Sequence, residues 1–204
     1  EKDIINANPD DPSGFAFAAR GVVNDSYGVA PLSLAQTGAL PYDAAVVVIA
    51  GPTRNMALVE FDVLDAWIKD GGRAIFMLDP PVPNSFRSLL EPWGLVVGDA
   101  TIVDAGSSLF GDARSPLIQS GQYVEGIPIT RDLDTSLLPR STPIETALTP
   151  EKIPPWVKYT PLAQTTTLSW KTIDQDRDEF DPGAGDILGP YMVAVTVHAC
   201  GVVG

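Results

Sequence analysis

Two apolar runs on either side of a helical segment constrain the fold more than any other feature of this sequence. The first run, residues 44–50, is a continuous series of alanine, valine and isoleucine, which is typical of a strand covered on both faces. In the helical pattern that follows, Phe61, Leu64 and Ile68 share one face, and a Gly-Gly pair ends it. The second run, residues 73–80, reads RAIFMLDP. This order predicts two adjacent parallel strands joined by a right-handed helical crossover.

The remainder of the first half extends this alternation of strands and helices. Further expected elements are a helix that starts at residues 11–13 and runs to Asn24, a short strand at 29–35, a helix at 84–93 and a third hydrophobic strand at 100–105. The sequence therefore predicts an α/β fold, with an open, mostly parallel sheet of the Rossmann or flavodoxin type and helices on both faces.

Prolines divide the second half of the chain into short segments from Gly106 onward. The last segment, residues 190–199, is rich in valine, and we expect it to return to the interior of the same sheet. A chain of 204 residues that is 45% hydrophobic can bury a substantial core. We predict one domain over residues 1–204, with an α/β half at 1–105 and a Pro-rich, strand-containing continuation at 106–204 joined to the same sheet.

Charge and cysteine content argue against several classes of protein. The formal net charge of −13 opposes binding to nucleic acid, whose partners gain affinity from clustered Lys and Arg, and it disfavours anionic lipid surfaces. The single cysteine, Cys200, excludes an internal disulfide framework and a cysteine-rich zinc site. The chain starts at Glu1 and has no apolar stretch near the ~20 residues that cross a bilayer, so we expect a soluble piece of a longer protein.

Catalytic and cofactor motifs are not evident in the sequence. A serine hydrolase needs a G-x-S-x-G turn and a histidine base, and neither is present in convincing form. The single histidine, His198, lies in the terminal strand pattern, where we expect a structural role, and Cys200 would share its face as a weak metal or thiolate signal. Residues 51–55 hold one glycine where a dinucleotide loop needs three. We therefore predict no catalytic residue and no cofactor.

An acidic run at residues 174–186 invites comparison with a calcium-binding loop. It departs from the EF-hand pattern, because its sixth position is Glu179 instead of glycine and its twelfth is Gly185 instead of glutamate. We expect a solvated loop and no dedicated metal site, with weak calcium binding as the alternative.

The ends of the two predicted strands form the candidate binding site. Gly51, Thr53 and Arg54 follow the first strand and Asp79 follows the second, so they should emerge at the carboxyl ends of neighbouring strands, where open α/β sheets bind ligands. Three interpretations stay open: Arg54 contacts a ligand or partner, it pairs with Asp79 or another carboxylate to support the loop, or the charges are simply solvated. Asn55 is expected to cap the helix that follows.

Several blocks resemble a known family. They are residues 41–80, 89–104, 161–170, the acidic run and 189–197, they occur in family order, and they cover most of residues 42–197. The chain resembles the auxiliary domain of an ABC-type uncharacterised transport system, a family that includes a gliding-motility auxiliary protein of the Bacteroidetes type. The family is also similar to the N-terminal module of an intraflagellar transport subunit.

The resemblance implies a membrane-anchored protein of the bacterial cell membrane, whose soluble domain lies on the extracytoplasmic side beside an ABC permease and ATPase. We expect a non-catalytic domain that binds or scaffolds these subunits, an extracytoplasmic partner protein or a small solute. One alternative is an amidotransferase-like or other hydrolase-fold enzyme, which would need a nucleophile where residues 51–54 stand. Another is a carbohydrate-binding module, which is supported only by four tryptophans and several carboxylates.

Overall fold

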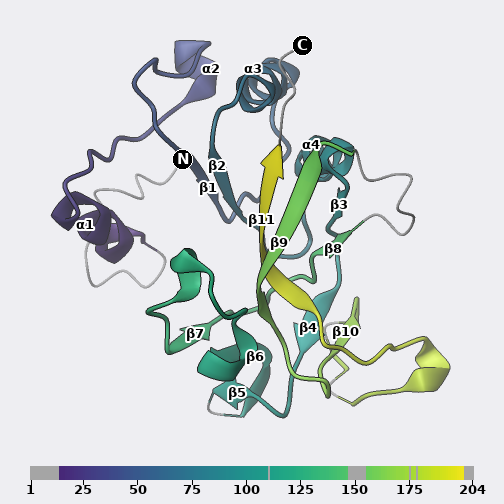
Figure 1. Cartoon of the computed structure of the whole chain (residues 1–204). Coiled ribbons are helices and arrows are strands. Elements are labelled where there is room, and N and C mark those ends of the chain that lie inside the picture. Colours follow the sequence, from purple (N-terminus) through teal and green to yellow (C-terminus); the bar gives the residue numbers. More distant parts are fainter. Residues whose placement is uncertain (1–13, 110, 147–154, 175, 178, 200–204) are drawn as a thin grey trace.

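The computed structural model describes residues 14–109, 111–146, 155–174, 176–177 and 179–199, and Figure 1 shows their arrangement. The α-helices are α1 Ala16–Asn24, α2 Leu34–Thr37, α3 Leu58–Lys69 and α4 Asn84–Leu90, and the 3-10 turns are η1 Glu91–Trp93, η2 Ser120–Gln122, η3 Pro128–Thr130 and η5 Pro182–Ala184. The strands are β1 Val47–Ala50, β2 Ala74–Met77, β3 Leu95–Val96, β4 Thr101–Val103, β5 Ser108–Leu109, β6 Asp112–Gln119, β7 Thr135–Leu137, β8 Glu145–Thr146, β9 Val157–Gln164, β10 Trp170–Thr172 and β11 Met192–Ala199. Within this part of the chain, no helix combines the length and apolar character needed to cross a bilayer.

The strand-helix-strand unit predicted from the two apolar runs is confirmed. β1 and β2 pair in parallel, with Val48 opposite Ile75, and α3 makes the connection between them. Leu64 on the predicted apolar face of α3 is buried. The Gly-Gly stop has a steric cause, because a Cβ added at Gly72 would lie 2.2 Å from the Trp67 ring. Glycine at this position therefore lets the chain turn tightly under α3 into β2.

The predicted open, mostly parallel sheet of the Rossmann or flavodoxin type is wrong. Among the described strands β1–β2 is the one parallel pair, and the pairs β3–β8, β4–β10 and β9–β11 and the three-stranded set β5–β6–β7 are antiparallel. The apolar run at 100–105 does contain a fully buried strand, β4, but this strand pairs with β10 instead of extending the parallel pair. An apolar run predicts a strand and does not select its pairing partner. The runs at 44–50 and 73–80 were expected to be covered on both faces, but Val48 and Ile75 are exposed.

The N-terminal region also differs from the sequence prediction. Residues 29–35 do not form the expected strand, and within this stretch the chain runs unpaired into α2. Pro31 lies in the middle of it and has no N–H to donate to a neighbouring strand. The helix expected before Asn24 is present as α1, whereas its expected start at residues 11–13 lies outside the described residues. The helix expected at 84–93 is present as α4 followed by η1.

A hydrophobic cluster joins the two halves of the chain. The buried members of this cluster are Val82, Phe86, Leu90, Leu95 and Val97. The inward residues of the parallel pair, Ile49, Phe76 and Leu78, pack against it, and so do Tyr159, Val195 and Val197 of the β9–β11 pair. The C-terminal half is therefore joined to the first half by this packing and by the antiparallel pairs β3–β8 and β4–β10. Its last strand, β11, pairs with β9 and does not, as predicted, enter the sheet of β1 and β2. The expected single domain over residues 1–204 stays a prediction.

A buried aspartate forms a second contact between the two halves of the chain. Asp104 follows β4 and is fully buried. Its carboxylate accepts hydrogen bonds from the backbone N–H of Thr166 at 2.9 Å and from the Thr166 hydroxyl at 2.7 Å. Its own N–H donates to the Ala113 carbonyl at 2.7 Å. The buried carboxylate therefore joins the end of β4 to the segment that connects β9 with β10, and the Asp104 backbone N–H joins it to β6.

Replacing Phe86 by alanine tests whether the cluster holds the fold together. Phe86 is 3% exposed, so Phe86→Ala leaves a cavity in the cluster and should lower the free energy of unfolding by about 3–5 kcal/mol. Phe17→Ala is the matched control, because Phe17 is 66% exposed on α1 and its loss should cost no more than about 0.5 kcal/mol. Urea titration of both variants measures the difference, and equal losses would contradict this role of the cluster.

Candidate functional site

The carboxyl ends of β1 and β2 lie next to each other. The N–H of Gly51 donates to the Met77 carbonyl at 2.9 Å, which continues the parallel ladder one residue beyond β1. Gly51 has a φ of +56°, a backbone conformation that favours glycine. A Cβ added there would lie 3.5 Å from the carboxylate of Asp79. The two loops that leave the strands therefore start side by side, as the sequence predicted.

Reciprocal hydrogen bonds brace the loop after β1 against the start of α4. The Asn55 side-chain oxygen accepts from the backbone N–H of Ser85 at 2.9 Å, and the Ser85 hydroxyl accepts from the backbone N–H of Met56 at 3.0 Å. Asn55 therefore caps α4, not the helix that follows it in sequence as predicted. At the start of α3 the capping hydrogen bond comes instead from Glu60, whose carboxylate accepts from the Ala57 N–H at 2.8 Å.

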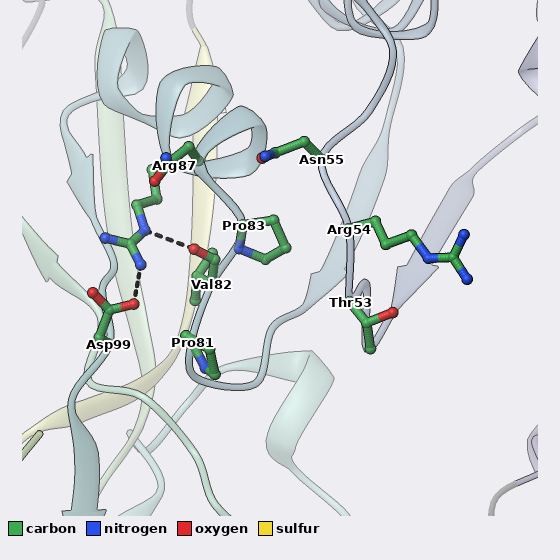
Figure 2. Close-up of a pocket in the computed structure, with 9 residues that line it drawn as sticks. Thr53, Arg54, Asn55, Pro81, Val82, Pro83, Arg87 and Asp99 are labelled. Atoms are coloured by element: carbon green, nitrogen blue, oxygen red, sulfur yellow. Dashed lines mark hydrogen bonds and ion pairs between the residues drawn. The ribbon is translucent and has the colours of Figure 1, made fainter. Parts of the chain in front are cut away.

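A second brace holds the loop after β2. The Arg87 Nε donates to the Val82 carbonyl at 2.7 Å, and the Arg87 guanidinium forms an ion pair with Asp99, as Figure 2 shows. Both loops border a groove of about 390 Å³. Its lining residues are Thr53, Arg54, Asn55, Pro81, Val82, Pro83, Asn84, Arg87 and Asp99. The hydrogen bonds on both sides make this groove a preorganised surface.

The four predicted site residues divide into two pairs. Thr53 and Arg54 line the groove, whereas Gly51 and Asp79 lie at the strand ends beside it. Arg54 forms no ion pair with Asp79, and within the described part of the chain its guanidinium has no hydrogen-bond or ion-pair partner. Figure 2 shows the Arg54 side chain directed away from Pro83 and α4. The geometry therefore does not support the interpretation that Arg54 pairs with a carboxylate to brace the loop.

Sequence reasoning missed the residues on the far side of the groove. Arg87 and Asp99 were not singled out, because a pairing between residues 12 positions apart depends on how α4 returns to β3. The proline-rich segment after Asp79 was the available signal. A stretch that contains Pro81 and Pro83 immediately after a buried strand predicts an exposed loop at the strand end.

The other sequence features of interest lie outside the groove. His198 is exposed near the end of β11, opposite Lys158 of β9, and its expected partner Cys200 lies outside the described residues. In the ranges that the structure describes, no group of three or more His, Cys, Asp or Glu residues is placed to hold a metal ion.

The acidic run is organised by one arginine. Arg177 makes a two-pronged ion pair with Asp186, donates to the Thr172 hydroxyl at 3.1 Å and lies 5.1 Å from the centroid of the Trp170 ring. The Asp186 carboxylate also accepts from the Asp181 N–H at 2.8 Å. The hydrogen bonds from Arg177 hold the pKa of Asp186 below its usual value, against the opposing effect of burial. The positive charge that holds this loop together is therefore the Arg177 side chain.

Comparison with known proteins places these features in a family. A family model described as an ABC-type uncharacterized transport system matches residues 5–199. The chain belongs to this family. It is an auxiliary protein of an ABC transport system, and membership implies association with an ABC transporter. No curated protein matches the auxiliary protein in a sequence comparison.

A solved structure shares the fold of the auxiliary protein. It is described as the mmIFT52 N-terminal domain, and it matches with a TM-score of 0.54 and 16% sequence identity. The match covers 74% of this chain and 70% of that chain. At this identity the likeness concerns the fold alone.

Substitution of Asn55 tests the brace between the two loops. Asn55→Ala leaves the Ser85 N–H at the start of α4 without its acceptor and should lower the free energy of unfolding by about 1 kcal/mol. Asn55→Asp is the control, because a carboxylate keeps the acceptor and suits the N-terminal end of a helix. Thermal unfolding monitored by circular dichroism compares the variants. Equal stability of Asn55→Ala and the wild type would contradict the brace.

The pH dependence of unfolding tests the arginine closure of the acidic run. Because the folded-state pKa of Asp186 is lowered, its stabilising contribution is fully present above the unfolded-state value of about 3.9. It is lost as the pH falls through the lower, folded-state value. Asp186→Asn should therefore melt below the wild type at neutral pH, and the gap should close in acid. Asp62→Asn, on the exposed side of α3, is the control, and a gap independent of pH would refute the assignment.

Proposed function

We propose that the auxiliary protein contributes a non-catalytic, extracytoplasmic binding or scaffolding domain, and that the groove at the ends of β1 and β2 is its binding site. The observation that carries this proposal is Arg54, a guanidinium without a partner in the described residues at the rim of a braced groove. In a protein of net charge −13, an anionic group finds this part of the surface the least repulsive.

The partner that suits this site is a subunit of the transporter. Family membership implies association with an ABC transporter, so the permease and ATPase subunits and extracytoplasmic proteins that work with them are the first candidates. The groove is also large enough to receive a small solute. The recognised group is an acidic side chain or another anion that reaches Arg54 at the rim of the groove, where its side chain is directed away from Pro83. A protein partner can also contact Pro81 and Pro83 with its neighbouring residues.

A non-catalytic role is supported by what stands at the strand ends. An amidotransferase-like or hydrolase site would need a nucleophile at the turn after β1, and residues 51–54 supply neither Cys nor Ser. His198, the only histidine, lies exposed on β11 and has no side-chain hydrogen bond to a described residue. Binding therefore accounts for the groove without a reacting group.

The membrane location is part of the same proposal. A transporter-associated domain reaches its subunits most readily when its own chain is anchored in the same membrane, because tethering raises the effective concentration of the partner. The extracytoplasmic side of a bacterial cell membrane is the location that the family resemblance implies.

Substitution of Arg54 tests the binding site. Arg54→Ala should weaken binding of the transporter subunits by about 1–3 kcal/mol, the range for losing a hydrogen bond to a charged group, with little change in melting temperature. Arg20→Ala on α1 is the matched control and should bind as the wild type does. Calorimetric titration against the purified permease and ATPase complex gives both values. Unchanged binding by Arg54→Ala would show that the groove is not the site.

A further inference from the structure

The parallel pair β1–β2 has one face that nothing covers in the described structure. Along residues 73–79 exposed and half-buried side chains alternate without interruption. The outward residues include Ile75, 51% exposed, and Met77, 43% exposed, and Val48 of β1 lies opposite Ile75 and is 55% exposed. We call the surface made by Val46, Val48, Ile75 and Met77, together with Arg73 and Asp79 at its two ends, the outer face.

The opposite face of the same pair is well packed. Ile49, Phe76 and Leu78 point inward and contact the hydrophobic cluster around Phe86. Parallel strands occur almost only where both faces are covered, so an apolar outer face on such a pair indicates a missing partner. A contiguous apolar patch of this kind on a protein surface marks an interaction site.

The charges at the two ends of the outer face identify the partner. Strand alternation places Arg73 two residues before Ile75 and Asp79 two residues after Met77, all four on the same face and all exposed. Within the described part of the chain, neither the Arg73 nor the Asp79 side chain has an ion-pair partner. Along β2 the outer face therefore has a positive charge at one end, two apolar side chains in the middle and a negative charge at the other end. Such a pattern is complementary to itself when one copy is turned end for end.

We propose that the outer face binds the outer face of a second copy of this chain across a twofold axis. Two-fold interfaces use the same patch on both subunits, and packed sheets bury their apolar faces against each other. With the strands of the two copies antiparallel, Arg73 of each copy faces Asp79 of the other, while Val48, Ile75 and Met77 meet in the middle. Each end of the interface then carries one pair of opposite charges.

The charge of the whole chain favours this face over other surfaces for self-association. Two copies carry −13 each and repel one another over most of their surfaces. The outer face is locally neutral, because Arg73 balances Asp79 and the residues between them in β2 are uncharged. With four apolar side chains per copy, the outer face makes a small interface, and we expect a weak dimer that dissociates on dilution.

Sedimentation velocity on the whole chain, from low to several hundred micromolar, tests the proposal. The wild type should pass from monomer to dimer as the concentration rises. Val48→Asp should raise the dimer dissociation constant by about tenfold or more, because it places a charge in the apolar centre. Ile173→Asp is the matched control, since Ile173 is 77% exposed immediately before the acidic run, and this variant should dimerise as the wild type does.

Exchanging the charges of Arg73 and Asp79 distinguishes this dimer from binding of a different partner to the outer face. Arg73→Asp and Asp79→Arg each place like charges together at both ends of the dimer and should raise the dissociation constant roughly two- to thirtyfold. The double variant restores both pairs and should recover wild-type dimerisation. A monomeric wild type at all concentrations would overturn the proposal. Failure of the double variant to recover would equally overturn the twofold arrangement. The proposal stands apart from Arg54, whose substitution should leave dimerisation unchanged.

Discussion

The structure depends on one hydrophobic cluster, which is built by residues 82–97. The strand pairs β1–β2 and β9–β11 both pack against it. The pairs β1–β2 and β9–β11 have two strands each, and an isolated two-stranded pair is at best marginally stable in water. Phe86 and Leu95 lie in the cluster that receives the inward side of both pairs. Because α4 carries Phe86, its position fixes the distance between the two halves of the chain.

The same helix positions the proposed binding groove. Asn55 caps α4 from the loop after β1, and Arg87 reaches from α4 to Val82 and Asp99. Both loops at the strand ends are therefore held to an element that is itself anchored in the core, which limits the conformational entropy that a partner must remove on binding. The outer face of β1–β2 lies on the other side of these strands from the core, so one strand-helix-strand unit presents two different surfaces. One is polar and grooved, and the other is flat and apolar.

Local patterns in the sequence predicted local structure well. The continuous apolar runs predicted β1 and β2, and the Gly-Gly pair predicted the end of α3. Both signals are local, because strands favour apolar residues and the tight turn at Gly72 leaves no room for a side chain. The sequence carries no comparable signal for the pairing of distant strands. The strand at 100–105 was expected in an open, mostly parallel sheet, and β4 instead pairs antiparallel with β10. For the site, the neighbouring strand ends followed from topology. The sequence left open whether Arg54 pairs with Asp79, and the structure shows no such pair. The cap from Asn55 to α4 did not follow from the sequence, because an asparagine before a helix ordinarily caps that helix, and here the partner lies 30 residues away.

Hydrogen exchange on the auxiliary protein, alone and with its permease and ATPase complex, tests the central claim most directly. Binding at the strand-end groove should slow exchange of the backbone amides in residues 53–56 and 82–87, which line the groove or follow its two loops. The amides of the acidic run, residues 174–186, should exchange at the same rate in both samples and serve as the internal reference. Protection of the acidic run with no change at the groove would contradict the account and move the binding site to the other half of the chain.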